Sequence, residues 1–301
     1  MQSFPVDKQD AEIRLDRWFK RYYPHVPTSM IQKACRKGLI RVNGAKAKPE
    51  ARLAAGQIIE VKFLDLDAGV PTSVATVKLS KAEKQEVRRW VLFENRDMLV
   101  LNKPAGLAVQ GGSGVRDHLD LRLEAFDPRP KLVHRLDKDT SGCLLLAKST
   151  QAAAHYTKLF RQDAIHKTYL AITCGVPHPL EGQIESRMQK EGTVEKMRSG
   201  EEGKVAITDY QVLDHVHKRA SLASLQPITG RTHQLRVHMA EMECPILGDG
   251  KYGGREAFID GLELAKQLHL HAWRLEVEGE VFEAPLPKHM KDSMKKLGLK
   301  V

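Results

Sequence analysis

The sequence predicts a two-domain α+β protein in which a small, basic α/β module precedes a larger domain with a mixed, mostly antiparallel sheet. A chain of 301 residues usually forms about two domains. Its composition, 42% hydrophobic and 29% charged, is typical of globular domains. Beyond residue 88 the strand-like and helix-like segments do not alternate regularly, which favours an α+β arrangement over a parallel βαβ sheet.

The first module is predicted to begin with two helices. Apolar residues from Ile13 to Tyr22 follow a helical period, and Pro24 ends this helix. A second helix is predicted over residues 30–36, with Thr28 or Ser29 as its N-cap. Its apolar positions face inward and its lysines and arginines face outward.

Strands follow these helices. Gly38 is a typical C-terminal stop for a helix. The segment LIRVNGAKAK (39–48) then predicts a hairpin around the Asn43-Gly44 turn, and QIIEV (57–61) predicts a closing strand. The module therefore has the order α–α–β–β.

Positive charge is concentrated in this module. The whole chain carries a net charge of +10, and residues 12–62 hold twelve Lys or Arg against four Asp or Glu, a net +8. Such a concentration fits a surface that binds nucleic acid. A solvated face without a partner fits the charge alone equally well.

The same segment resembles the small RNA-binding module named after ribosomal protein S4. The resemblance rests on LDRWF, MIQKACRKGLIRVNG and AGQIIEV, within residues 15–61. It implies an S4-like RNA-binding domain over residues 12–64, whose second helix and hairpin face structured RNA. The positions that match this face are Lys33, Arg36, Lys37 and Arg41.

A linker and a larger domain are expected to follow. Residues 65–87 mix Asp, Gly, Pro, Ser and Thr with a charge-rich stretch, which is typical of a linker. The second domain, residues 88–301, begins with two strands around a turn at Asn95–Asp97. Two further buried strands are predicted at CLLLAKS (143–149) and HKTYLAITCGV (166–176), with a helix between them.

Several protein classes are disfavoured by the sequence. No run approaches the roughly 18 apolar residues of a membrane span, and the first residues lack a secretory pattern. The cysteines form no CxxC pair, so buried reduced thiols are expected rather than disulfides or a zinc site. A cytoplasmic location is expected for such a sequence. The cysteines are Cys35, Cys143, Cys174 and Cys244.

The most informative segment is LVHRLDKDTSGCLLLAKS, residues 132–149. A polar loop rich in charged and hydroxyl side chains joins two apolar strands. Such a loop on a rigid scaffold indicates a partly desolvated site, in which a carboxylate must be paired or take up a proton. A tight turn whose Asp and Ser side chains bond their own backbone explains the residues equally well.

A second polar segment covers residues 225–253. Thr229 or Gly230 is predicted to begin a helix that runs from Thr232 to Met242. Its first turns would carry Arg231, His233 and Arg236, and arginines at a helix N-terminus suit a phosphate or carboxylate.

Kinase and metal-site interpretations fit poorly. In HRLDKDT, Leu136 separates Arg135 from Asp137, so the kinase HRD spacing is absent, and GGSGV (111–115) is only a weak phosphate cradle. His233 and His238 are five residues apart, which does not align them on a helix, and no HExxH sequence is present.

Together these segments resemble the RluA-type pseudouridine synthases. HRLDKDTSG (134–142) matches the family signature, LNKPAGL (101–107) its opening motif and KTYLA (167–171) its Tyr-bearing strand. PITGRTHQLRVHM (227–239) and PILGDGKYG (245–253) match its closing motifs. AVQGGSGV (108–115) and the S4-like module resemble the branch of this family that acts on large-subunit ribosomal RNA.

The resemblance implies an enzyme that isomerises uridine in RNA to pseudouridine without cofactor or metal. Asp137 is the implied catalytic carboxylate, which attacks C1′ of the sugar or removes the C2′ proton. Arg236 is its implied partner, and Tyr169 stacks on the uracil near C5. Arg135 is implied to fill the space that the flipped nucleotide leaves.

The other residues of the predicted site are assigned as contacts or supports. Arg231 and His233 are expected to contact RNA, Lys103 and Pro104 to support the site, and Asp139 to stabilise its turn. The partner is RNA, no membrane is involved, and a monomer is expected. The residues alone leave two alternatives open, a non-catalytic RNA-binding ribosome-assembly factor and a phosphotransferase or metal-dependent nuclease that acts on RNA.

Overall fold

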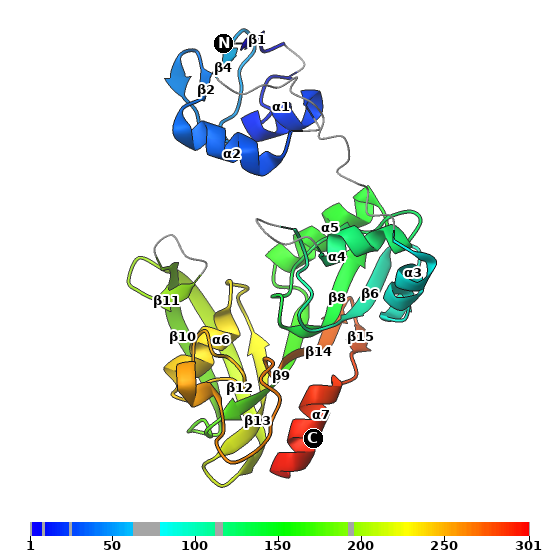
Figure 1. Cartoon of the computed structure of the whole chain (residues 1–301), viewed down its shortest axis with the longest axis vertical. Helices are drawn as coiled ribbons and strands as arrows, with labels where there is room; N and C mark the ends of the chain where they lie inside the picture. Colours follow the sequence, from blue (N-terminus) through cyan, green and yellow to red (C-terminus); the bar gives the residue numbers. More distant parts are fainter. Residues whose placement is uncertain are drawn as a thin grey trace. The chain divides into compact units, whose positions relative to one another are not determined.

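The chain forms two compact units, residues 1–77 and 78–301. The computed structural model describes residues 2–7, 10–23, 26–62, 79–111, 117–191 and 196–300. Figure 1 shows the elements of each unit along the chain. The predicted stop at Pro24 and all but the first residue of GGSGV (111–115) lie outside the described residues.

The first unit is a four-stranded antiparallel sheet with two helices. The strand order is β1-β4-β2-β3, and the two helices and the hairpin follow the predicted order. Strand β1 was not predicted; it pairs with β4 from Gln2↔Val61 to Pro5↔Ile58. The bounds are β1 Gln2–Pro5, α1 Leu15–Tyr22, α2 Thr28–Lys37, β2 Ile40–Val42, β3 Ala45–Lys46 and β4 Ile58–Val61.

Helix α2 ends as predicted but begins differently. Gly38 takes the left-handed conformation (φ 69°) as the C-cap. The N-cap is Pro27, and no side chain caps the helix, so the prediction of Thr28 or Ser29 as cap was wrong. Thr28 is already the first helical residue. Ile31 and Ala34 are buried in the core, as expected from their spacing.

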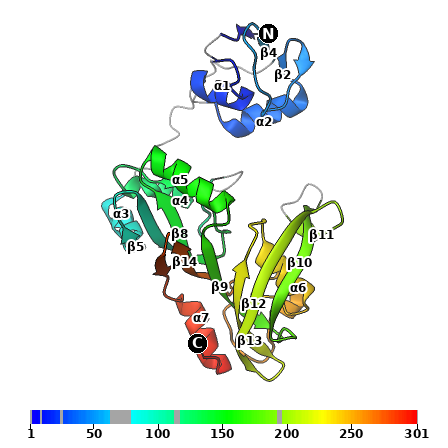
Figure 2. The same cartoon turned by 180° about the vertical axis from the view of Figure 1, so that it is seen from behind.

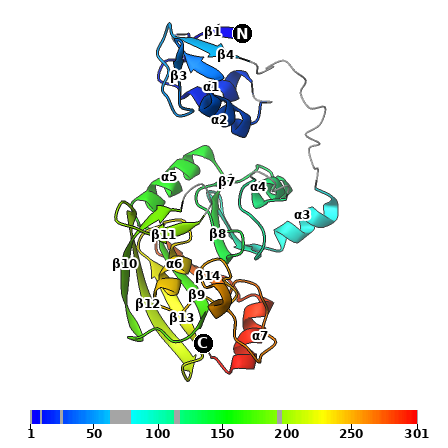
Figure 3. The ribbon, with the colours of Figure 1, turned by 60° about the vertical axis from the view of Figure 1, so that its left-hand side comes forward.

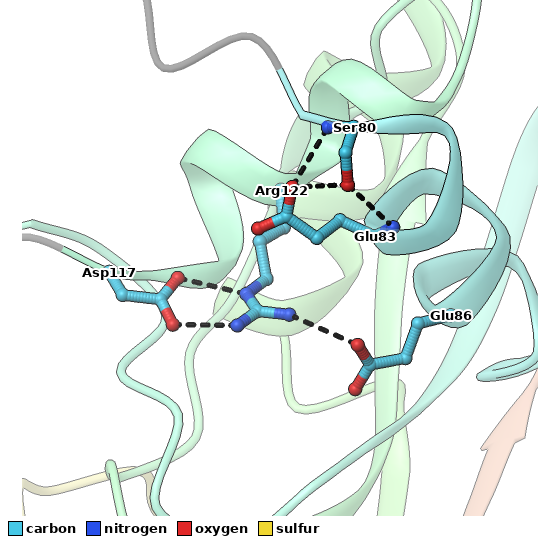
Figure 4. Close-up of polar contacts among 5 residues, drawn as sticks. All are labelled: Ser80, Glu83, Glu86, Asp117 and Arg122. Atoms are coloured by element: carbon cyan, nitrogen blue, oxygen red, sulfur yellow. Dashed lines mark hydrogen bonds and ion pairs between the residues drawn. The ribbon is translucent and has the colours of Figure 1, made fainter.

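The second half of the expected linker is a helix of the second unit. Helix α3, Lys81–Arg88, begins with a capping box, in which Ser80 Oγ accepts from the Glu83 amide and Glu83 accepts from the Ser80 amide (Figure 4). Val87 is fully buried in the core cluster that also contains Leu119 and Leu123. The charged composition of this segment reflects the exposed face of an amphipathic helix, and this is why composition suggested a linker.

Arg122 connects helix α3 to the rest of this unit. Its guanidinium donates two hydrogen bonds to Asp117, at 2.8 and 2.7 Å, and lies 3.9 Å from a carboxylate oxygen of Glu86 (Figure 4). The hydrogen bonds that Arg122 donates to Asp117 raise the pKa of Arg122, and the guanidinium also lies over the Trp90 ring.

The second unit is built on an eleven-stranded, mostly antiparallel sheet, as predicted. The order along its main path is β11-β10-β12-β13-β9-β14-β8-β6-β5; β15 pairs with β14 and β7 with β8. The pairing of β14 with β8 is parallel. The strands are β5 Val91–Glu94, β6 Met98–Lys103, β7 Lys131–Leu132, β8 Ser141–Ala147, β9 His166–Cys174, β10 Glu181–Lys190, β11 Met197–Ser199, β12 Lys204–Val216, β13 Ala220–Pro227, β14 Leu270–Val277 and β15 Glu280–Glu283.

Helices cover different parts of this sheet, as the opposite view in Figure 2 also shows. Helix α5 packs against β8, while α6 contacts β10, β11, β12 and β13. Apolar residues of α7 join the core cluster that includes residues of β9 and β13. The remaining helical elements are α4 Leu119–Arg122, η2 Leu123–Ala125, α5 Thr150–Arg161, α6 Gln234–Glu241, η3 Gly254–Ala257 and α7 Lys288–Leu297.

One row of paired residues crosses the middle of the sheet. Lys103 on β6 is opposite Gly142 on β8, Gly142 is paired with Ala272 on β14, and Ala272 is opposite Tyr169 on β9. Gly142 has a φ of 111°, and a Cβ at this position would lie 2.2 Å from the Ala272 carbonyl oxygen. Only glycine fits here.

Four histidines of the second unit have depressed pKa values; His238, His269 and His271 are fully buried and His134 is partly buried. Burial lowers the pKa of His134 to about 3 and that of His238, His269 and His271 to about 4. Their rings contact hydroxyl or backbone groups: His271 Nδ1 lies 2.8 Å from Ser141 Oγ, and His134 Nε2 accepts from the Leu145 amide. They are therefore neutral in the folded protein at neutral pH.

The free energy of unfolding is expected to fall as the pH is lowered from about 6.5 to about 4. In this window the unfolded chain binds protons at these histidines, whose pKa is then near the ordinary 6.5, and the folded chain does not. Each contributes up to about 1.4 kcal/mol per pH unit. Urea unfolding at several pH values measures the slope. His269→Gln should reduce the slope by the contribution of one proton, and a variant slope equal to that of the wild-type protein would contradict the assignment.

Candidate active site

Two cavities meet at the loop between β7 and β8. One has a volume of about 390 Å³ and extends to β9, and the other has about 860 Å³ and extends towards Val109 and Lys266. Residues from the loop and from the start of α6 line both cavities, so these two segments form the boundary between them. The shared residues are Arg135, Leu136, Asp137, Thr232, His233 and Arg236. Figure 3 shows α6 and the strands near it from a third direction.

Asp137 lies at this boundary in a short turn. The Thr140 amide donates to the Asp137 carbonyl oxygen, and the turn leads into β8. The side chain is 29% exposed, and its Oδ2 atom lies 3.8 Å from Nε2 of His233. The carboxylate is therefore partly buried and open to the cavities.

Tyr169 faces the smaller cavity from β9. Its burial raises the pKa of its hydroxyl well above the usual range, and the charge of Asp137 raises it further. The hydroxyl therefore keeps its proton at neutral pH. The sequence-predicted pair of Asp137 and Tyr169 thus lines one cavity.

Arg236 is held by a partner other than the predicted one. Its Nε and Nη2 atoms donate to Asp249 at 2.8 and 2.6 Å, and the two side chains are 8% and 1% exposed. Burial alone would lower the pKa of Arg236, but the bonds and charge of Asp249 outweigh it and raise the pKa. The expected direct pairing with Asp137 is thus replaced by a bidentate pair with Asp249, which the sequence analysis did not single out.

The helix that carries Arg236 is shorter than predicted. It begins at Gln234 rather than near Thr229 or Thr232, and His233 is its N-cap, with a φ of 56°. Arg231 lies before the helix, is exposed and donates from Nε to the Val205 carbonyl oxygen.

Gln234 fixes the segment that precedes α6. Its Oε1 atom accepts from the Arg231 amide and from the Thr229 hydroxyl, while its Nε2 atom donates to the Ile207 carbonyl oxygen and to Thr208. These bonds tie the segment to β12, and this explains why the chain stays irregular past the predicted helix start.

Lys103 is fully buried and joins the two loops that border the site. Its Nζ atom donates to the carbonyl oxygens of Pro104, Leu107 and Lys138, at 2.8 to 3.0 Å. Burial lowers its pKa to about 7, while Asp139 and Asp137 act in the opposite direction. Three acceptors match the three N–H donors of the ammonium form, whereas a neutral amine has two. A supporting position was expected for Lys103 and Pro104.

The remaining predicted contact residues lie on exposed surface. Arg135 is exposed and lines both cavities. In the first unit Lys33, Arg36 and Lys37 are exposed on α2. Arg41 differs, because its guanidinium donates to the carbonyl oxygens of Gly38 and Gly44 and so stabilises the hairpin.

Three residues of the site were missed. Lys167 is two positions before Tyr169 on β9, so both face the smaller cavity, and strand alternation could have shown this. Its burial lowers its pKa. Asp249 and Tyr252 belong to a motif that was recognised only as a whole, PILGDGKYG. Their contacts with Arg236 and His233 connect segments that no local pattern relates.

The described part of the chain contains no group of three or more His, Cys, Asp or Glu side chains placed to hold a metal ion. All four cysteines are free and buried, and burial raises the pKa of the Cys35 thiol to about 11 and that of Cys143 to about 12. Among the helices in the described ranges, none has the length and apolar character that crossing a membrane requires.

Comparison with known families agrees with this geometry. The model of the RNA pseudouridylate synthase family matches residues 97–241, which include Asp137, Tyr169 and Arg236, and the S4 domain model matches residues 13–59. The chain belongs to the RNA pseudouridylate synthase family and carries an N-terminal S4 domain.

Similar proteins carry a more particular name. A protein of Rickettsia bellii named ribosomal large subunit pseudouridine synthase C is 36% identical, over 92% of this chain and 95% of its own. A Vibrio vulnificus protein of the same name is 35% identical, over 95% and 91%. The solved structure of human RNA pseudouridylate synthase domain containing 4 is 31% identical, with a TM-score of 0.62 over 73% of this chain and 97% of that one.

Replacement of Lys103 by Met is expected to lower the free energy of unfolding by about 2–5 kcal/mol, because three carbonyl oxygens lose their donor at a buried position. Urea unfolding at pH 7 measures the change. Lys138→Met removes an exposed side chain from the same loop and should change the free energy by less than about 0.5 kcal/mol. Equal effects of the two variants would contradict the supporting role of Lys103.

Proposed function

We propose that this protein isomerises uridines in large-subunit ribosomal RNA to pseudouridine, with Asp137 as the catalytic group. The observation that carries the proposal is the position of Asp137, a partly exposed carboxylate where two cavities meet, with Tyr169 in one of them. The relatives named as ribosomal large subunit pseudouridine synthases support the choice of RNA.

The reaction exchanges one bond of the base for another. The N1–C1′ bond breaks, the uracil rotates, a C5–C1′ bond forms, and C5 loses the proton that N1 gains. Asp137 acts through its ionised carboxylate, either by attack on C1′ or by removal of the C2′ proton. Tyr169 offers a ring that can stack on the uracil, and its protonated hydroxyl would then lie near the base.

Arginines around Asp137 are proposed to hold the RNA. A base in a helical stack cannot reach a carboxylate between two cavities, so the nucleotide must leave the stack. Exposed Arg135 borders both cavities and is placed to occupy the vacated space, while Arg231 and His233 border the entry. Lys167, half-buried in the smaller cavity, adds a positive charge for a backbone phosphate.

The two units divide the work in this proposal. Residues 12–64 bind structured RNA through Lys33, Arg36 and Lys37 and through the hairpin that contains Arg41. The second domain, which includes α3 and continues from residue 88 onward, performs the chemistry. We propose that the protein acts as a monomer. The proposed location is the cytoplasm.

Asp137→Asn is expected to abolish product formation and leave RNA affinity nearly unchanged, since the variant keeps the size and polarity of the side chain and removes the charge. The loss should reach at least about a thousandfold, several kcal/mol of barrier. Single-turnover assays with excess enzyme measure it. Asp139→Asn, in the same turn, should keep at least half of the rate. An Asp137→Asn variant with more than a tenth of the wild-type rate would rule out the assignment and favour a non-catalytic assembly factor.

Removal of residues 1–64 is expected to weaken binding to long structured RNA and to lower its salt dependence, because most of the excess positive charge lies there. The log–log salt slope should fall by roughly one unit for each lost phosphate contact. Chemistry at saturating RNA should survive, since every proposed catalytic residue lies beyond residue 100.

Charge substitutions provide the matched control. Lys33, Arg36 and Lys37 changed together to Gln should reproduce much of the loss of slope. The same change at three exposed lysines of the second unit, Lys218, Lys291 and Lys295, should have less effect. Equal effects of the two triple variants would mean that α2 is not the RNA anchor. A truncated protein that binds RNA but cannot isomerise uridine would mean that the first unit helps to form the site.

A further inference from the structure

A chain of polar contacts reaches Asp137 from the buried Asp249. The Tyr252 hydroxyl lies 2.6 Å from Nδ1 of His233, and Nε2 of the same ring lies 3.8 Å from Oδ2 of Asp137. On its other side, the Tyr252 ring lies 5.0 Å from the Arg236 guanidinium carbon, and Arg236 is bound by Asp249. His233 is thus the group between Tyr252 and the catalytic carboxylate.

The contacts of Tyr252 determine which ring nitrogen of His233 carries the proton. The Met197 amide donates to the Tyr252 oxygen at 3.1 Å, so this oxygen accepts one hydrogen bond. Burial raises the pKa of Tyr252, so the hydroxyl keeps its own proton at neutral pH. His233 Nδ1 is the acceptor that the described residues offer for that proton. If Nδ1 donated instead, the hydroxyl proton would have no acceptor among them.

An Nδ1 that accepts leaves the ring proton on Nε2, directed at Asp137. The opposite tautomer would place the Nε2 lone pair against the carboxylate oxygens, which is repulsive. At 3.8 Å the two groups are beyond hydrogen-bond distance, and a small movement of either side chain would bring them within it. A donor here can hold the carboxylate oxygens in one orientation for the proposed reaction.

The geometry points to Tyr252 as a positioning residue that fixes His233 in its Nε2–H tautomer and so presents a hydrogen-bond donor to Asp137. This inference rests on the proposed function and extends it. Arg236, which Asp249 binds, lies against the Tyr252 ring, and the charge of Asp137 also acts on its guanidinium.

The backbone of His233 supports the same role. His233 takes a left-handed conformation with a φ of 56°, which non-glycine residues adopt at a cost. Gln234 holds the adjacent residues to β12, and the Tyr252 ring packs edge-on against the imidazole, with centroids 5.5 Å apart. The imidazole is thus held at a defined orientation between Tyr252 and Asp137.

The experiment combines single-turnover kinetics with the tautomer itself, read from ¹⁵N chemical shifts of ring-labelled histidine in the full-length protein at one pH. Tyr252→Phe keeps the ring over Arg236 and removes the hydroxyl. We expect a 10- to 100-fold lower rate, an unchanged RNA affinity, and a loss of the Nε2–H signature at His233. The His233 signals are assigned by their absence in His233→Asn, a substitution that tolerates the positive φ. Tyr156→Phe, at a buried tyrosine outside the site, should change neither rate nor shifts.

A double variant separates positioning from general damage. Once His233→Asn is present, adding Tyr252→Phe should lower the rate no further, since both changes remove the same donor. Effects that multiply, a rate for Tyr252→Phe within twofold of wild type, or an Nδ1–H tautomer in the wild-type protein would each overturn the inference. The ¹⁵N measurement does not depend on activity. A wild-type protein without synthase activity would therefore reject the proposed function, while the ¹⁵N shifts would still show which tautomer His233 adopts.

Discussion

The close approach of β8 to β14 at Gly142 is the constraint on which the rest of the site depends. A side chain here would collide with the Ala272 carbonyl group, so the parallel pairing of the two strands requires glycine. This pairing places Lys103, Gly142, Ala272 and Tyr169 in one row across four strands. Asp137 lies in the loop that leads into β8, five residues before Gly142. The register of β8, β14 and β9 therefore determines that Asp137 and Tyr169 line the same cavity.

The cations around Asp137 differ in how firmly they are held. Asp249 binds Arg236 through two hydrogen bonds, and three carbonyl oxygens enclose the Lys103 ammonium group. Charges that are fixed in this way cost little reorganisation when the charge of a substrate changes. Arg135 is exposed instead, and Arg231 is exposed but held by a single hydrogen bond to the Val205 carbonyl oxygen. The site therefore combines buried cations that are fixed by their partners with exposed cations at its border.

Much of this could be predicted from the sequence, because local patterns determine it. The helical period and Gly38 located α2, and the Asn43-Gly44 turn located the hairpin. The signature HRLDKDTSG placed Asp137 in a loop that borders a cavity. The pairing of Arg236 with Asp249 could not be derived, since it joins a helix to a later turn through side chains alone. Helix α3 was assigned to a linker because its single buried valine, Val87, leaves a mostly polar composition.

The two units use positive charge in different ways. In the first unit Lys33, Arg36 and Lys37 are exposed on α2, and within the described residues none of them forms an ion pair or side-chain hydrogen bond. Such charges bind phosphates with little geometric selectivity and respond strongly to salt. In the second unit the buried cations are committed to partners inside the protein, so they cannot contribute in the same way to long-range attraction. Exposed cations attract RNA over a distance, whereas cations held by partners orient groups in the site. One set of residues could not do both, because the cations of the site would then have to be mobile.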